Sequence, residues 1–106
     1  MAYQRILTIQ DISCVGQCSL TVALPILSAC GHETAALPTA VLSTHTGRFQ
    51  GYTFRDLTDD IPGIQAHWER EGLDFSAVYT GYLASARQIA LVRDVIRSRL
   101  RPGGVL

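Results

Sequence analysis

The sequence has 106 residues, of which 47% are apolar, and nine basic residues balance nine acidic ones, so the formal net charge is zero. This length allows one small domain and excludes two, the apolar fraction excludes a disordered chain, and the neutral balance offers no basic surface for nucleic acid. No apolar run reaches the roughly 18 residues that a membrane span needs. All nine basic residues are arginines, and the absence of lysine excludes a Walker-type phosphate-binding lysine and a Schiff-base lysine.

The first third of the chain predicts a strand, a helix and a second strand. The apolar run Arg5 to Ile9 is typical of a buried parallel strand. A polar turn, Gln10 to Gln17, leads to a helical pattern that Ser19 opens. Its apolar side chains fall on two adjacent stripes, so this helix is expected to be deeply buried. Gly31 is a good stop for the helix, and the second strand is predicted at Thr34 to Leu37.

The rest of the chain continues the alternation. A loop rich in hydroxyl groups, Thr39 to Thr46, comes first, and Gln50 to Phe54 is expected to be an exposed strand or flap. Thr58 can cap a helix that has Asp59 and Asp60 in its first turn, where acidic side chains suit the helix dipole. The remaining predicted elements are a strand at Ser76 to Thr80, a helix opened by a capping box of Ser85 and Gln88, a stop at Pro102-Gly103, and the start of a strand at Val105.

This order of elements predicts an α/β fold with three layers, α/β/α, around a mainly parallel sheet. The alternation breaks off at Val105-Leu106, so we interpret residues 1–106 as a truncated portion of one domain. An odd number of cysteines, Cys14, Cys18 and Cys30, without a secretory signal favours the reducing cytoplasm. Cys14 and Cys18 are too few for a zinc site on their own, and no metal site is predicted.

Polar, glycine-containing segments follow the predicted strands, at the edge where open α/β sheets bind their ligands. Asp11 has two interpretations that composition does not separate: it can cap the next turn, or it can hold a ring nitrogen or a hydroxyl group of a ligand. His45 lies among hydroxyl groups and glycine, where a structural histidine is more common than a catalytic one. A Ser-His-Asp hydrolase is not supported, because no Gly-x-Ser-x-Gly motif is present.

Three motifs, in this order along the chain, resemble those of the pyridoxal/pyridoxamine kinase family in the ribokinase-like superfamily. The first comprises Asp11-Ile12-Ser13, Gly16 and the run Cys18 to Ile26. The second is Pro38 to Gly47, in which Thr44 stands where the family usually has Asn. The third is Thr80 to Ser85, in which Ala84 stands where the family usually has Gly. The resemblance spans essentially the whole chain.

The resemblance implies a ribokinase-like fold and ATP-dependent phosphorylation of the 5′-hydroxymethyl group of a B6 vitamer, a step in pyridoxal 5′-phosphate salvage by a cytoplasmic homodimer. Matched by position, the substrate-binding residues would be Asp11, Cys18, Thr46 and Tyr82. An aspartate beside the pyridine ring would favour the protonated ring nitrogen, since a nearby anion stabilises the cation. The supporting loop residues would be Ser13, Gly16, His45, Gly47 and Gly81.

The family's chains are much longer, and its acidic metal-binding strand, its ATP site and its catalytic aspartate would all lie beyond residue 106. The resemblance therefore puts ATP, Mg²⁺ and every catalytic residue outside this chain, which would be the N-terminal, vitamer-binding portion of the kinase domain and inactive alone. The flap Gln50 to Phe54 is a candidate dimer contact, and no nucleic-acid or membrane partner is expected.

Two alternatives stay open. One is a hydroxymethylpyrimidine kinase of the same superfamily, whose N-terminal loop is usually richer in glycine. The other is a non-catalytic α/β binding fragment. A receiver-like domain is excluded, because it needs an acidic pair after its first strand and a lysine, and Asp11 stands alone.

Overall fold

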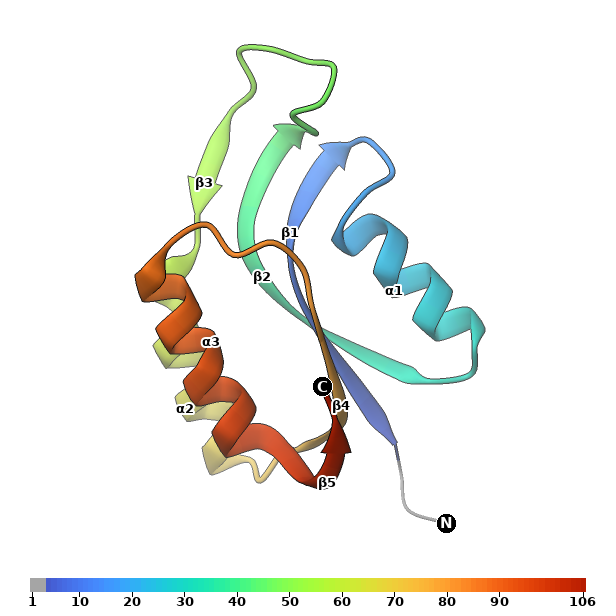
Figure 1. Ribbon diagram of the computed structural model, residues 1–106, viewed down its shortest axis with the longest axis vertical. Helices are drawn as coiled ribbons and strands as arrows, with labels where there is room; N and C mark the ends of the chain where they lie inside the picture. Colours follow the sequence, from blue (N-terminus) through green and yellow to red (C-terminus); the bar gives the residue numbers. More distant parts are fainter. Residues whose placement is uncertain (1–3) are drawn as a thin grey trace.

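The computed structural model describes residues 4–106, which fold into one sheet with helices on both faces (Figure 1). Within this range the sheet has five strands in the order β3-β2-β1-β4-β5. All neighbouring strands are parallel except β3, which is antiparallel to β2. The predicted α/β fold with a mainly parallel sheet is therefore confirmed. The elements are β1 (Arg5–Val15), α1 (Leu20–Ala29), β2 (Glu33–Thr44), β3 (Phe54–Asp56), the 3₁₀ turn η1 (Thr58–Asp60), α2 (Ile61–Arg70), β4 (Phe75–Thr80), α3 (Ala86–Arg99) and β5 (Leu100–Val105).

The hydrophobic core lies between the sheet and the pair of helices α2 and α3. Leu7 and Ile9 alternate along β1 and belong to one buried cluster with Ile61 of α2 and Val92 of α3. Because side chains alternate across a strand, Leu7 and Ile9 point to the same face of the sheet. Phe75 of β4 adds the largest fully buried ring. This side of the sheet is the well-packed layer of the domain.

Strands β1 and β2 are longer than predicted, so the expected turn after Ile9 and the expected loop from Thr39 are wrong. The two strands stay paired as far as Val15 opposite Thr44. Polar side chains in this stretch do not end the strands, because pairing with a neighbour decides strand length more than the preference of single residues. A register shift between Gln10 and Ile12 inserts one extra residue into β2.

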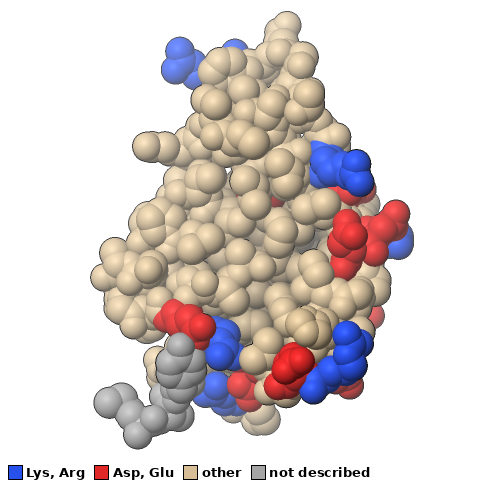
Figure 2. All heavy atoms as spheres, turned by 180° about the vertical axis from the view of Figure 1, so that it is seen from behind, with Lys and Arg blue, Asp and Glu red and all other residues tan. Residues whose placement is uncertain are grey.

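Helix α1 is much less buried than its composition predicts. Leu20 is its only buried residue, and the Ile26 side chain is 56% exposed. The expectation of deep burial is wrong, because the helix covers the sheet with one stripe while nothing in residues 4–106 covers the other. The surface that α1 forms, on the left of Figure 2, has no charged side chains. No helix among the described residues is long and apolar enough to cross a membrane.

The starts of the later helices differ in detail from the prediction. Thr58 does not cap α2; it begins η1, and its backbone N–H donates to Asp56 Oδ1 at 2.9 Å. Ser85 caps α3 as predicted, since its Oγ accepts from the backbone N–H of Gln88 at 3.1 Å. The Gln88 side chain completes the box one residue early, because its Oε1 accepts from the N–H of Ala84 at 2.8 Å.

The last strand begins earlier than predicted. The chain passes directly from α3 into β5 at Leu100, well before Val105. Pro102 is tolerated within β5, because β5 is an edge strand and pairs only with β4.

Candidate functional site

The candidate site lies at the carboxyl ends of β1 and β2. Asp11 and Ser13 follow Leu7 and Ile9 on the same face of β1, and Ser13 pairs with Leu42 of β2. The extra residue in β2 keeps Leu42 on this face. One long strand therefore contributes to the core with its first half and to the site with its second half.

Two adjoining hollows make up the site. The first, of about 400 Å³, we call the inner hollow, and the second, of about 210 Å³ beside β3, we call the flap hollow. The inner hollow falls within the range of about 300–1,000 Å³ that is usual for small-molecule sites. Both hollows are lined by Asp11, Leu42, Thr46 and Tyr82. Side chains from three separate segments of the chain thus meet at one edge of the sheet.

All four residues that the sequence assigned to substrate binding line the inner hollow, namely Asp11, Cys18, Thr46 and Tyr82. Their role in binding stays a prediction. Of the supporting residues, Ser13, His45 and Gly47 also line it. Gly16 lies beneath the His45 ring, and Gly81 lies against the Gln10 side chain, where a Cβ would come within 2.8 Å of Oε1.

Asp11 is partly buried inside β1, so it caps no turn, and the capping interpretation is wrong. No residue between 4 and 106 donates a hydrogen bond to its carboxylate. Beside it, Ser13 is fully buried, and its Oγ lies 3.8 Å from the Sγ of Cys18. The Tyr82 side chain is 82% exposed, so the hollow is open toward solvent on that side. The arrangement offers one uncommitted anion, hydroxyl groups and an aromatic ring.

Two aromatic residues of the site were missed at the sequence level. Tyr52 and Phe54 line the flap hollow, and both side chains are exposed. Phe54 pairs with Leu42 across the β2–β3 ladder, which fixes its place at the hollow. The signal was present in the alternation of Tyr52 and Phe54, which puts both on one face of an extended segment.

Gln88 is another residue that was missed as part of the site. Its side chain is 2% exposed and lies at the base of the flap hollow. Its Nε2 donates to Thr58 Oγ1 at 3.1 Å and to the Thr39 carbonyl at 3.4 Å. Together with the bond from Ala84, these contacts join the loop that carries Tyr82 to β2 and η1.

Carboxyl groups with a shifted pKa lie outside the two hollows. Hydrogen bonds from Thr58 lower the pKa of Asp56. A hydrogen bond from Arg101, whose Nη2 lies 3.0 Å from Oδ1, lowers the pKa of Asp74. The three cysteines are free thiols. In the part of the chain that the structure describes, no three His, Cys, Asp or Glu side chains lie together in a group that could hold a metal ion.

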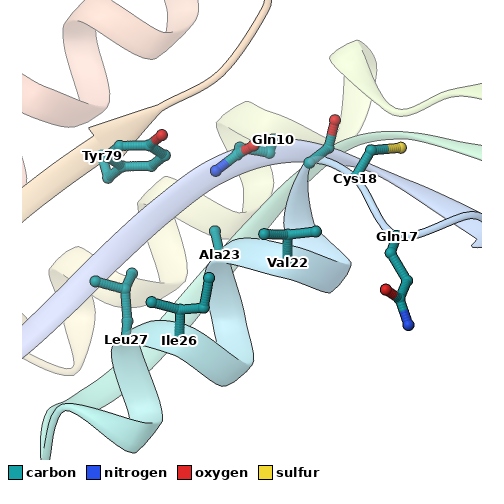
Figure 3. A pocket seen from close by; sticks show the side chains of 9 residues that line it. Gln10, Gln17, Cys18, Val22, Ala23, Ile26, Leu27 and Tyr79 are labelled. Atoms are coloured by element: carbon teal, nitrogen blue, oxygen red, sulfur yellow. The ribbon is translucent and has the colours of Figure 1, made fainter.

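A further hollow, of about 440 Å³, lies on the opposite face of the sheet between α1 and β4 (Figure 3). Ala23, Ile26 and Leu27 of α1 form one wall, Tyr79 of β4 forms the other, and Gln10 lies between them. Apart from Gln10, Gln17, Cys18, Ser19 and the Tyr79 hydroxyl group, the lining of this hollow is apolar. It has no carboxylate, so we place the candidate site on the Asp11 side.

Solved structures resemble the chain over nearly its whole length. A candidate phosphomethylpyrimidine kinase from Bacteroides thetaiotaomicron has a TM-score of 0.92 and 45% identity, over 97% of this chain and 36% of that chain. The pyridoxal kinase from Lactobacillus plantarum has a TM-score of 0.87 and 35% identity, over 92% of this chain and 35% of that chain. A pyridoxal kinase from Leishmania donovani, with a TM-score of 0.77 and 22% identity, supports the fold alone.

No protein-family model and no curated protein sequence matches the chain. The chain spans about 36% of the length of the Bacteroides relative. Both the Bacteroides and the Lactobacillus relatives are at least 35% identical to this chain over more than nine-tenths of its length. The chain therefore belongs to the ribokinase-like kinases, in the family that includes the pyridoxal kinases.

Proposed function

We propose that the 106 residues form the N-terminal, vitamer-binding part of an ATP-dependent kinase for the 5′-hydroxymethyl group of a B6 vitamer. The supporting observation is the convergence of Asp11, Thr46 and Tyr82 on one hollow. A second crystal form of the Bacteroides relative, 45% identical to this chain, was solved with pyridoxal. A flat, polar heteroaromatic ring is the ligand that this set of side chains suits.

Each side chain of the site has a chemical role in this proposal. The Asp11 carboxylate, which no protein donor among residues 4–106 engages, would pair with the pyridine nitrogen and hold it protonated. The Thr46 hydroxyl would bond the phenolic oxygen, and Tyr82 would cover one face of the ring. Tyr52 and Phe54, from the flap, would shield the ring from the side of β3. Cys18 would form part of the wall.

The phosphoryl-transfer step belongs, in this proposal, to the part of the relatives' chains that lies outside the match. ATP would supply the γ-phosphoryl group and Mg²⁺ would neutralise its charge, and positioning with charge neutralisation is most of what this reaction requires. The contribution of this chain is to bind and orient the vitamer. We also propose that the whole kinase is a cytoplasmic homodimer in which the flap, Gln50 to Phe54, contacts the partner.

A hydroxymethylpyrimidine kinase is the second candidate, because the Bacteroides relative is described as a phosphomethylpyrimidine kinase. A pyrimidine lacks the phenolic hydroxyl group that Thr46 would bind. The two candidates therefore differ at Thr46: Thr46→Val should weaken the binding of pyridoxal more than the binding of hydroxymethylpyrimidine.

The test is a titration of the ¹⁵N-labelled chain with pyridoxal and with hydroxymethylpyrimidine, followed by NMR. We expect pyridoxal to shift the amide resonances of residues around Asp11 and Thr46. Asp11→Ala should weaken this binding by about 1–3 kcal/mol, the usual cost of leaving a polar partner unpaired. Binding of pyridoxal on the α1 face, or preferential binding of the pyrimidine, would contradict the proposal.

A further inference from the structure

The β1–α1 loop and the β2–β3 loop touch at one point beside the inner hollow. Gly16, just after β1, has a φ of +121°, and a Cβ built on it would lie 2.2 Å from Cδ2 and 2.9 Å from Cγ of His45. The imidazole ring therefore rests on the glycine backbone. The position demands glycine for two reasons, the left-handed backbone and the absence of space for a side chain.

Hydrogen bonds hold the same ring and its backbone in place. The His45 backbone N–H donates to the Val15 carbonyl at 2.9 Å, which extends the β1–β2 ladder beyond the strands. The Gly47 backbone N–H donates to His45 Nδ1 at 3.2 Å. A ring nitrogen that accepts a hydrogen bond carries no proton, so this geometry requires the neutral imidazole with its proton on Nε2.

A third contact closes the arrangement. The Phe49 ring meets the His45 ring edge-on, with the ring centres 5.2 Å apart. Thr46 lies between His45 and Gly47, in the turn that the bond to Nδ1 closes, and its side chain lines both hollows. The position of the Thr46 hydroxyl group therefore depends on where the His45 ring sits.

We propose that His45 is a positioning residue: its neutral ring, seated on Gly16, fixes the Thr46–Gly47 turn and so sets the place of the Thr46 hydroxyl group in the vitamer site. This inference rests on the proposed function and adds a residue that acts through Thr46 without touching the reacting atoms. It also couples the β1–α1 loop, which carries Cys18, to the β2–β3 loop.

A double-mutant cycle tests the coupling. Gly16→Ala should push the ring aside, and His45→Ala should release the turn, so each should raise the Kd for pyridoxal about tenfold, within the range of coupling between residues in contact. In the double variant, the ring that the added methyl group would strike is gone. The Kd of the double variant should therefore be about tenfold above that of the wild type, and not a hundredfold above it. His45→Asn, whose Oδ1 can still accept from Gly47, should recover part of the affinity, whereas His45→Phe should not.

Gly31→Ala is the matched control. Gly31 also has a left-handed φ, +90°, but nothing lies within 4 Å of the place of its Cβ. Its alanine variant should lower thermal stability through backbone strain, with no change in the Kd and no coupling to His45→Ala.

The position of Thr46 can be followed without ligand. Its amide resonance should move in Gly16→Ala and stay in place in Gly31→Ala. If the wild-type chain bound no pyridoxal, the proposed function would fail, and this resonance would still decide the inference. A multiplicative effect in the double variant, or an unmoved Thr46 resonance in Gly16→Ala, would overturn it.

Discussion

Replacing Gln88 with leucine, and comparing it with the same substitution at Gln65, should show how much the hydrogen bonds of the Gln88 side-chain amide contribute to stability. Gln88 and Gln65 are the same residue type on neighbouring helices, but Gln88 bonds Thr39, Thr58 and Ala84, whereas the buried Oε1 of Gln65 has no partner among the described residues. Leucine is close to glutamine in size, so each substitution mainly removes the polar atoms. Gln65→Leu is therefore the matched control for Gln88→Leu.

The loss of stability expected for Gln88→Leu depends on which hydrogen bonds the former partners of Gln88 keep. The Thr39 carbonyl still accepts from the N–H of Leu57 at 3.0 Å, and the Thr58 hydroxyl still donates to Asp56. Ala84 is exposed, so its N–H can turn to water. Because no partner is left wholly unbonded, the cost stays near 1 kcal/mol per lost bond, or about 2–3 kcal/mol in all. Gln65→Leu should cost nothing or stabilise the chain by up to about 1 kcal/mol.

Urea unfolding followed by circular dichroism measures both variants, and equal slopes against urea would show that the unfolded states are comparable. Amide exchange in residues 81–85 should also become faster in Gln88→Leu, because that loop loses its bond from Ala84. An equal loss of stability in the two variants would show that burial of these side chains, and not their hydrogen bonding, matters at both positions.

Three further predictions concern packing, charge and activity. Phe75→Ala should lower the free energy of unfolding by about 3–5 kcal/mol in urea, because Phe75 is 1% exposed and its ring meets Trp68 edge-on. The lowered pKa of Asp74 stabilises the fold at pH values above the usual carboxyl pKa of about 3.9, and this contribution is lost as the pH falls through the lowered pKa. Asp74→Asn should remove the contribution, which is less than about 1 kcal/mol at neutral pH because the pair of Asp74 and Arg101 is partly exposed. A curve of stability against pH should therefore become flatter on its acid side. The purified 106 residues should form no pyridoxal 5′-phosphate from pyridoxal and ATP when the product is followed by its absorbance; product formation that followed the chain through purification would contradict this.

The order of strands and helices could be predicted because it follows from the spacing of apolar residues along the sequence. The runs that became β1, β2 and β4 are apolar where both faces of the sheet are covered, and Ser85 is a cap that depends only on its near neighbours. The ends of β1 and β2 could not be predicted, since polar residues such as Asp11 continue the strands there. These residues line the candidate site, where the pattern of a buried strand no longer applies.

Some residues of the candidate site could likewise be predicted from the sequence, and others could not. Asp11, Thr46 and Tyr82 could be placed together because parallel strands bring their carboxyl ends to one edge. Tyr52 and Gln88 could not, because their places depend on the β2–β3 register and on hydrogen bonds to residues far along the chain. The contact between Gly16 and His45 is of the same kind: each residue appeared in a motif, but only the folded chain brings the His45 ring so close to Gly16 that a Cβ there would lie 2.2 Å from Cδ2.

The exposed stripe of α1 leads to a last prediction. Ile26 and Ile89 are both exposed isoleucines on helices, with exposed fractions of 56% and 45%. Ile26 borders the apolar hollow beside Tyr79, whereas Ile89 lies on α3 and does not line that hollow. Contiguous apolar surface of this kind promotes association, whereas a single exposed apolar side chain is ordinary. Ile26→Glu should therefore reduce both the binding of an apolar dye and the concentration-dependent association of the chain in sedimentation velocity, while Ile89→Glu should change neither. Both variants should keep the wild-type stability within about 0.5 kcal/mol, since neither side chain is buried. If Ile89→Glu reduced association as strongly as Ile26→Glu, the α1 face would have no special part in it, and the low burial of that helix would carry no consequence for the isolated chain.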